Sequence, residues 1–381
     1  MIMPENNPDK IQINTEEDLS LIFTADFSYR ARDIIAAPKN QYDLRVKENT
    51  IAIVTDGSDI VGLGNLGAEA ALPMMEEKAR LYKEYADIDA FPICLQTQNT
   101  QEIVEVIRNI LPIFAGINIE DIESPRAQEI EQALQDAGIP VYQDDYHGLA
   151  ISLLSALINA SILSGKNLQD LKVVINGVKP ITTAFVQLVL SHAKQNNLFQ
   201  PVKEVLLCDA SGIISRSRHD LKEGSLLHNL AHVTNKNDMQ GSVKDALLGA
   251  DVYVEFEPTN TLTEAAIQSM ADKPVVFSLE SNELDHEKLM QAGAFICASQ
   301  KEGVPSQIDS AFVFPGIFRG VLDADAKVIT HSMQVAAAVT FAQTVDKLSV
   351  NHIVPTQLNR GASQKVAQAV AEAFHQEFTS E

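Results

Sequence analysis

Residues 114–145 read FAGINIEDIESPRAQEIEQALQDAGIPVYQDD, and this stretch decides the fold class. Short apolar runs at Phe114–Ile119 and Ile139–Tyr142 predict two strands. The segment between them, Arg126–Ala137, has the spacing of an amphipathic helix. A strand, a helix and a second strand in this order are typical of a parallel sheet.

The same alternation extends outward from this stretch on both sides. Towards the N-terminus we expect strands at Thr50–Thr55 and Ala90–Leu95, and helices at Tyr29–Ala36, Met74–Tyr85 and Thr100–Leu111. Towards the C-terminus we expect an apolar helix at His147–Ser164, strands in LKVVINGV, EVLLCDASG, DVYVEF, PVVFSL and AFICAS, and closing helices at Ser332–Val345 and Ala362–Phe378. The sequence predicts an α/β protein with an N-terminal α/β domain at residues 1–165 and a C-terminal Rossmann-like, doubly wound domain at residues 166–381. We place their boundary near Gly165–Asn167.

Composition narrows the class of partner. The 381 residues include 29 Lys and Arg against 51 Asp and Glu, for a net charge of −22. Such a chain repels phosphate backbones and anionic lipid, so we expect neither a nucleic-acid nor a membrane partner. No apolar run reaches the ~20 residues of a membrane span. The cysteines, three in number and set far apart in apolar runs, predict reduced thiols and a cytoplasmic protein.

A glycine motif stands between the first predicted strand and helix. Gly62, Gly64 and Gly67 have the G-x-G-x-x-G spacing, and Asp87 and Asp89 follow about 20 positions later. A dinucleotide site fits this pattern. A tight connection that needs positive φ fits it as well, and so does an anion-binding helix N-terminus.

Acidic residues follow several predicted strands. Glu120 and Asp121 follow one, Asp144 and Asp145 follow another, and Asp56 ends the first. Ligands of open α/β sheets bind beyond the carboxyl ends of the strands, and clustered carboxylates suit Mg²⁺ or Mn²⁺ better than zinc. Capping of the following helices is the alternative role for these residues.

Longer strings resemble one known family. TDGSDIVGLGNLGAEAALPMMEEKARLYKEYADIDAFPICLQTQ, GINIEDIESPRAQEIE and IPVYQDDYHGLA resemble the catalytic domain of bacterial malic enzymes, and the similarity extends from DLSLIF to FPGIFRGVLD and the closing helix. The resemblance implies that Glu120, Asp121 and Asp145 are metal ligands, that Asp144 is a neighbouring active-site carboxylate and that Lys78 is the catalytic lysine. It also implies a small dicarboxylate substrate, a homodimer, and a catalytic rather than nucleotide-binding role for the VGLGNLG segment.

Other positions depart from the family pattern. The family's tyrosine in DLSLAYTPGVA is Phe23 here, which has no proton to donate. The nucleotide fingerprint NGAGAAG has become NGVKPIT, in which Gly177 remains but Lys179 and Thr182 replace glycines. Asp209 matches the acidic residue that the family uses to bind ribose.

Three further segments have changed at positions that the resemblance assigns to cofactor and substrate. A small-residue loop has become EFEPTN at 255–260, which places Glu255 and Glu257 in the expected phosphate path. ALANP is SLESN at 278–282, and NQINN is SQIDS at 306–310, so that Ser310 replaces an asparagine. The changes predict a protein that does not bind NAD or NADP.

Three functions remain compatible with this pattern. The first is decarboxylation of a C4 dicarboxylate such as oxaloacetate with Mg²⁺ or Mn²⁺ and without hydride transfer. The second is an NAD-dependent malic enzyme with an atypical cofactor site, and the third is an inactive homologue that binds a ligand or regulates a partner. For the proton that the enolate needs, Lys78 is the preferred donor and Tyr146 the alternative.

Overall fold

The computed structural model describes residue 36 and residues 45–191, 199–257, 262–279, 286–301, 304–355 and 360–378. The chain divides into two units, Met1–Glu48 and Asn49–Glu381. In the first unit the structure describes helix α3 (Arg45–Glu48). Phe23 and all of the predicted helix Tyr29–Ala36 except residue 36 lie outside the described residues.

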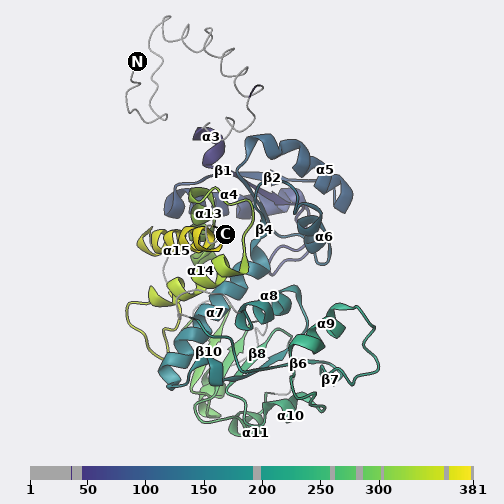
Figure 1. Ribbon diagram of the computed structural model, residues 1–381, viewed down its shortest axis with the longest axis vertical. Helices are drawn as coiled ribbons and strands as arrows, with labels where there is room; N and C mark the ends of the chain where they lie inside the picture. The colour runs from purple at the N-terminus through teal and green to yellow at the C-terminus, as the bar shows by residue number, and fades with distance from the viewer. Residues whose placement is uncertain are drawn as a thin grey trace, which may run out of the picture. The chain divides into compact units, whose positions relative to one another are not determined.

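A four-stranded parallel sheet forms the first part of the larger unit (Figure 1). Its strands are β1 (Thr50–Thr55), β2 (Asp89–Cys94), β3 (Gly116–Ile119) and β4 (Val141–Gln143), in the order β2-β1-β3-β4. The helices that accompany it are α4 (Ala68–Ala86), α5 (Thr100–Ile110) and α6 (Arg126–Ala133), with a 3-10 turn η3 (Leu111–Ile113).

Strand β1 is apolar throughout because both faces of this sheet are covered. Ile51 and Ile53 pack with Met75 of α4, whereas Ala52 and Val54 pack on the opposite face with residues of α5 and α6. Alternate side chains of a strand point to opposite faces, so a strand covered on both sides carries a continuous apolar run.

A second sheet has six strands in the order β10-β9-β8-β5-β6-β7. These are β5 (Lys172–Asn176), β6 (Glu204–Asp209), β7 (Gly212–Ile213), β8 (Val252–Glu255), β9 (Val275–Ser278) and β10 (Ile296–Ser299), all parallel except β7. The accompanying elements are η4 (Leu168–Asp170), α8 (Pro180–Val189), α9 (Leu226–Val233), α10 (Val243–Leu247), α11 (Glu264–Gln268) and α12 (His286–Gln291). The strand order reverses beside β5, as in doubly wound folds, so the predicted Rossmann-like architecture is confirmed.

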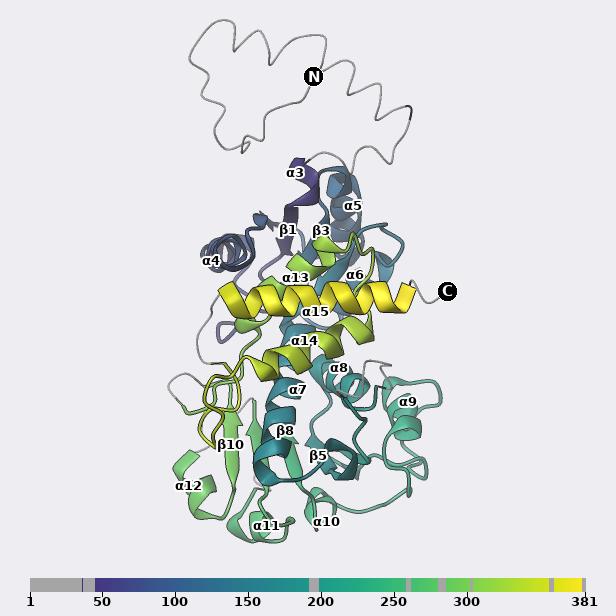
Figure 2. The ribbon, with the colours of Figure 1, turned by 60° about the vertical axis from the view of Figure 1, so that its left-hand side comes forward.

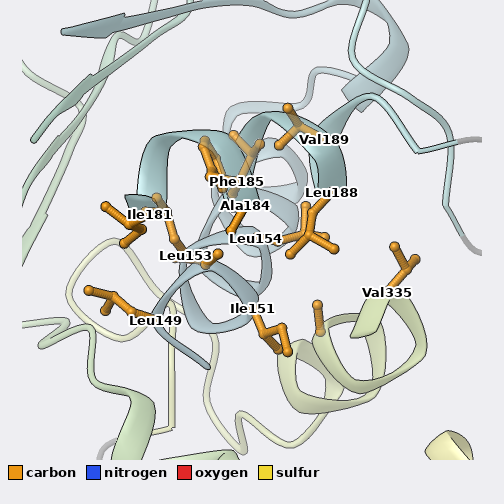
Figure 3. Close-up of a cluster of buried hydrophobic side chains, with 14 of the residues drawn as sticks. Leu149, Ile151, Leu153, Leu154, Ile181, Ala184, Phe185, Leu188, Val189 and Val335 are labelled. Carbon is orange, nitrogen blue, oxygen red and sulfur yellow. The ribbon is translucent and has the colours of Figure 1, made fainter. Parts of the chain in front are cut away.

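Helix α7 (Asp144–Ser164) links the two sheets, because it begins directly after β4 and ends shortly before β5. Its apolar side chains pack against α8 and against α14 (Figure 3). Gly165 ends the helix in the left-handed conformation, with φ of 77°. Because both sheets belong to the unit Asn49–Glu381, the domain boundary near this glycine stays a prediction.

The closing helices lie beside one another (Figure 2). A 3-10 turn η5 (Ser310–Phe312) precedes α13 (Phe314–Asp323), and α14 (His331–Gln343) and α15 (Arg360–Phe378) follow. Phe314 and Phe318 of α13 pack under the first sheet, whereas Val335 of α14 belongs to the core of the second. The C-terminal helices therefore contribute to both halves of the unit.

The expectation about membrane spans needs a correction. Helix α7, with 21 residues, is long and apolar enough to cross a membrane, but 78% of its most apolar window is buried inside the protein. This combination is common in core helices of soluble proteins, because an apolar helix is stabilised equally by a protein interior.

Candidate active site

The topology of the first sheet places a crevice beside β1. From β1 the chain passes to β2 on one side and then to β3 and β4 on the other, so the connections diverge beyond the carboxyl ends of β1 and β3. Glu120 and Asp121 follow β3 directly, and Asp144 and Asp145 are the first two residues of α7 after β4. The four carboxylates that the sequence singled out therefore lie at one edge of one sheet.

Lys78 of α4 brings a positive charge to the carboxylates at this edge of the sheet. Its ammonium forms ion pairs with Glu120 and, at 2.9 Å, with Oδ2 of Asp144. The same ammonium lies 4.6 Å from the centre of the Phe314 ring. Lys78, Glu120 and Asp144 are all buried, so the alternative of a solvated lysine on a helix surface is wrong.

Asp121 and Asp145 complete the cluster. The backbone N–H of Asp121 donates to Oδ2 of Asp145 at 3.0 Å, and the carboxyls of Glu120 and Asp145 hydrogen-bond each other. Asp121 has φ of 51°, in the left-handed region that asparagine and aspartate adopt more readily than most residues. Asp144 has room because residue 148, one turn later, is glycine: a Cβ there would stand 2.1 Å from Oδ1 of Asp144 and 3.1 Å from Cβ of Ser310. Ser310 thus lies against the first turn of α7.

The electrostatics of the cluster show an excess of negative charge. Burial, with Asp145 nearby, raises the pKa of Glu120 to about 8, and burial with Glu120 nearby raises the pKa of Asp121 to about 7. Burial also raises the pKa of Asp144 and Asp145 to about 6 each, against the effect of Lys78. Burial alone would lower the pKa of Lys78, but Asp144, Glu120 and Asp145 together raise it well above its usual value. One ammonium does not balance four carboxyls, three of them in buried residues.

A divalent cation fits these residues by their chemistry. The donors are all carboxylate oxygens, which Mg²⁺ and Mn²⁺ prefer, and neither His nor Cys is among them. Oδ2 of Asp121 and Oδ1 of Asp144 are buried without a hydrogen-bond partner among the described residues. In the described part of the chain no three His, Cys, Asp or Glu groups stand close enough to hold a metal as they lie. The assignment of Glu120, Asp121 and Asp145 as ligands therefore stays a proposal.

Asp56 and the glycine motif have structural roles in this crevice. Asp56 accepts from the guanidinium of Arg126 at 2.5 Å and from the backbone N–H of Ser58 at 2.9 Å, which ties the end of β1 to α6. The three motif glycines have φ between 71° and 82° in the loop before α4. This is the tight connection of positive φ that was one of the expected roles for the motif.

The second sheet offers a comparable crevice beside β5, and its backbone donors are already engaged. The N–H of Gly177 donates to the carbonyl of Cys208 at 3.0 Å. The N–H of Val178 donates to Oε1 of Glu257 at 3.3 Å, and that of Lys179 donates to Oγ1 of Thr182 at 3.0 Å. Residue 180 is proline and has no N–H. Together these contacts occupy the loop that would cradle a pyrophosphate.

Glu257 fills the space beside this loop. A Cβ at Gly177 would stand 2.8 Å from Cγ of Glu257, so the retained glycine makes room for the glutamate. Asn176 adds a hydrogen bond from its Nδ2 to the Glu257 carbonyl at 3.1 Å. Glu255, the other expected carboxylate, lies differently: the hydroxyls of Tyr253 and Ser278 donate to it at 3.4 and 3.2 Å. Of the two carboxylates, Glu257 is therefore the one that contacts the loop.

Asp209 is engaged as well. Its Oδ1 accepts from the guanidinium of Arg218 and from the backbone N–H of Ser211, both at 2.8 Å. The residues around β5 and β6 thus bond to one another within the chain. A dinucleotide would have to displace the Glu257 carboxylate and compete with Arg218 for Asp209.

Two tyrosines bear on proton delivery. The hydroxyl of Tyr146 donates to Glu131, and its ring packs 4.1 Å from that of His147, so Tyr146 serves as a packed aromatic at the helix start. Tyr82 was not expected. It follows Lys78 by one helical turn and is fully buried, and its hydroxyl has no hydrogen-bond partner among the residues described. Burial, with Asp144 and Glu120 nearby, raises its pKa well above the usual value. The i, i+4 spacing from Lys78 is the sequence signal that could have indicated it.

Comparisons with known proteins agree with the fold. The family model described as malic enzyme, N-terminal domain, matches residues 27–135, and that described as malic enzyme, NAD binding domain, matches residues 294–375. The second match begins beyond the fingerprint segment and beyond Asp209.

Relatives and solved structures cover nearly the whole chain. An NAD-dependent malic enzyme of Geobacillus stearothermophilus is 38% identical over 96% of this chain and 75% of its own. A bifunctional malic/malolactic enzyme of Bacillus subtilis is 36% identical over 96% and 88%. The crystal structure of an NAD-dependent malic enzyme from Thermotoga maritima is 33% identical, with a TM-score of 0.84 over 97% of this chain and 96% of that one.

An α/β enzyme with a carboxylate and lysine site beside one sheet and a Rossmann-like second sheet is the class that fold and site define. The chain belongs to the malic enzyme family.

Proposed function

We propose that this protein decarboxylates a C4 dicarboxylate such as oxaloacetate with a divalent cation and without hydride transfer. The observation that carries the proposal is the contrast between the two crevices. In the crevice beside β1, Lys78 forms ion pairs with Glu120 and Asp144. In the crevice beside β5, the Glu257 carboxylate accepts a hydrogen bond from the N–H of Val178.

The chain's own residues supply binding and proton transfer. Asp144 and Glu120 keep Lys78 in its ammonium form and aim it over Phe314. In the proposed reaction the C3–C4 bond of oxaloacetate breaks, carbon dioxide leaves, and its bonding electron pair stays on the enolate of pyruvate. The Lys78 ammonium then gives a proton to C3 and is reprotonated from solvent.

Glu120, Asp121 and Asp145 would hold the cation. When bound, Mg²⁺ or Mn²⁺ polarises the 2-oxo group and stabilises the negative charge that develops as carbon dioxide leaves. The buried surroundings strengthen this effect because they exclude water.

A second candidate function is NAD- or NADP-dependent oxidative decarboxylation of malate. The names of the relatives favour it, since the Geobacillus protein is called NAD-dependent and others are called NADP-dependent. The match to the malic enzyme NAD binding domain at residues 294–375 favours it too. It requires that Glu257 leaves the loop when nucleotide arrives.

An oxaloacetate assay separates the two functions. The wild-type protein is incubated with oxaloacetate and Mn²⁺, and pyruvate is measured with and without EDTA, against Mn²⁺ alone because the free ion is itself a catalyst. A parallel reaction contains malate with NAD or NADP. We expect pyruvate from oxaloacetate above the Mn²⁺ background, loss of it with EDTA, and no reduced nucleotide from malate. Reduced nucleotide would establish the second function, and no activity in either reaction would favour an inactive, ligand-binding homologue.

We further propose a cytoplasmic homodimer. Val61, Leu63 and Leu66, in the loop before α4, are 77%, 65% and 56% exposed and offer an apolar surface for a second copy. The buried free thiols of Cys208 and Cys297 suit a reducing compartment. Sedimentation at micromolar protein should give twice the chain mass, and a monomeric mass would refute the dimer.

A further inference from the structure

A separate cavity lies between the two sheets. Its volume is about 810 Å³, within the range of pockets that hold small organic molecules. One wall consists of α6, β4 and the first turn of α7, and the other consists of α8 and the segment that begins α14. Its lining includes none of the five cluster residues Lys78, Glu120, Asp121, Asp144 and Asp145. Gly177, Asp209 and Glu257 are absent from it, but the outer side of the second crevice's loop, Val178–Pro180, borders it.

Several buried polar atoms of the lining residues have no hydrogen-bond partner among the residues that the structure describes. They are Nε2 of Gln128, Nδ1 of His147, Oγ1 of Thr183 and the hydroxyl of Tyr142, the last in a side chain only 2% exposed. A buried polar group without a hydrogen bond costs roughly 1–3 kcal/mol. The amide and the two hydroxyls can all donate, and the imidazole nitrogen can do so as one of its tautomers. A ligand rich in acceptor oxygens would satisfy them.

The charged residues of the lining also favour a ligand with acceptor oxygens. Lys179 and Lys327 belong to it, and Glu131 is the acidic side chain among the described lining residues. Glu131 already accepts from the Tyr146 hydroxyl and lies 3.3 Å from Nε2 of His147. Lys327 pairs with the exposed Asp325, and exposed pairs contribute little free energy. In a chain of net charge −22 this balance is unusual.

Apolar groups complete the wall. Pro125, Ile139, Val141 and Val328 line the cavity beside these polar atoms. We propose that this cavity binds a small organic anion, whose carboxylate or phosphate faces the lysines and the unpaired donors and whose apolar body rests on these side chains. The ligand is distinct from the substrate of the carboxylate cluster.

The position of the cavity also couples it to that cluster. The first turn of α7 presents Asp144 and Asp145 to Lys78 and Asp121 on one side, and Tyr146 and His147 to the cavity on the other. A ligand that orders this turn would pre-organise the carboxylates. Its occupancy should therefore raise the affinity for Mn²⁺, and by linkage Mn²⁺ should raise the affinity for the ligand.

Binding can be tested with anilinonaphthalene sulfonate, an aromatic anion whose fluorescence rises in an apolar site. We expect saturable binding of one probe per chain. Gln187 is an exposed residue of the lining, and Gln187→Trp should weaken probe binding at least tenfold, about 1.4 kcal/mol, by filling the cavity. Gln364→Trp on the exposed face of α15 is the matched control and should bind the probe as the wild type does.

Competition identifies the head group. Benzoate and phenyl phosphate serve as carboxylate and phosphate competitors, and Lys327→Gln should weaken both relative to the control Lys365→Gln. Equal probe binding by wild type and Gln187→Trp would overturn the proposal and assign the probe to the exposed apolar loop at 61–66. Displacement by NAD as readily as by benzoate would also overturn it and assign the cavity to a nucleotide. Since the readout is fluorescence, the proposal can fail without any failure of the decarboxylase function.

Discussion

The two crevices of this protein have the same topological origin and opposite chemistry. Beside β1, acidic residues face a lysine, and two of their oxygens have no hydrogen-bond partner in the part of the chain that the structure describes. Beside β5, the carboxylate of Glu257 accepts from one backbone N–H group of its own chain, that of Val178. The difference shows that the role of a carboxylate at a strand end depends on its neighbours. Beside a lysine it can bind a ligand, whereas beside a backbone N–H of its own chain it can fill the crevice. For this member of the malic enzyme family we propose that the first crevice binds a cation and that Glu257 keeps a nucleotide out of the second.

The largest expected effect is the loss of Lys78. Lys78→Ala removes the ammonium that Asp144 and Glu120 hold, and the rate of oxaloacetate decarboxylation should fall by ~100-fold or more, as for a general acid. Lys179→Ala, at the other crevice, is the matched control and should keep the wild-type rate. Equal losses of activity in the two lysine variants would contradict the assignment of decarboxylation to the first crevice.

Two tyrosines sharpen this result. Tyr146→Phe should change the decarboxylation rate little, because its hydroxyl is bound to Glu131. Tyr82→Phe removes a buried hydroxyl without a partner, so the folded protein should tolerate it, with stability unchanged or higher by about 1 kcal/mol. If Tyr82 supports proton transfer near Lys78, the decarboxylation rate of Tyr82→Phe should lie between the rates of Tyr146→Phe and Lys78→Ala. A wild-type rate in Tyr82→Phe would show that the tyrosine only fills the core.

A smaller effect, on stability, distinguishes the two acidic residues directly. Mn²⁺ should raise the melting temperature of the wild type, because an ion that binds only the folded state stabilises it by mass action. Asp145→Asn should abolish most of that increase, whereas the equally conservative Glu257→Gln should leave it intact. A metal-dependent shift that persists in Asp145→Asn would mean that the ligands are misassigned.

Much of the framework could be predicted from local sequence. Strand β1 has the predicted bounds Thr50–Thr55, since an apolar run covered on both faces needs no other signal. Helix α4 begins at Ala68, six residues before the predicted start at Met74. Pro73 lies inside this helix, on its exposed side, where water can bond the carbonyl that loses its partner. Strand β7, two residues long, has too few residues for a periodic pattern.

The site was less predictable, because its contacts join distant parts of the chain. The four carboxylates could be placed at strand ends, but the pairing of Lys78 with Asp144 spans 66 positions. The contact of Val178 with Glu257 spans 79 positions. The sequence predicted acidic side chains in the phosphate path, yet only the fold shows that Glu257 meets the loop while Glu255 bonds to Tyr253 and Ser278. Asp56 likewise looked like a candidate ligand until its partner, Arg126, was placed beside it.

Calorimetry on one preparation of the wild-type protein tests the central claim most directly. The protein is titrated first with Mn²⁺ and then, in its presence, with NAD and with NADP up to millimolar concentration. Our account predicts a saturable heat of Mn²⁺ binding and no binding heat from either nucleotide, because Val178, Lys179 and Asp209 already have partners within the chain. A nucleotide dissociation constant in the micromolar range would contradict it.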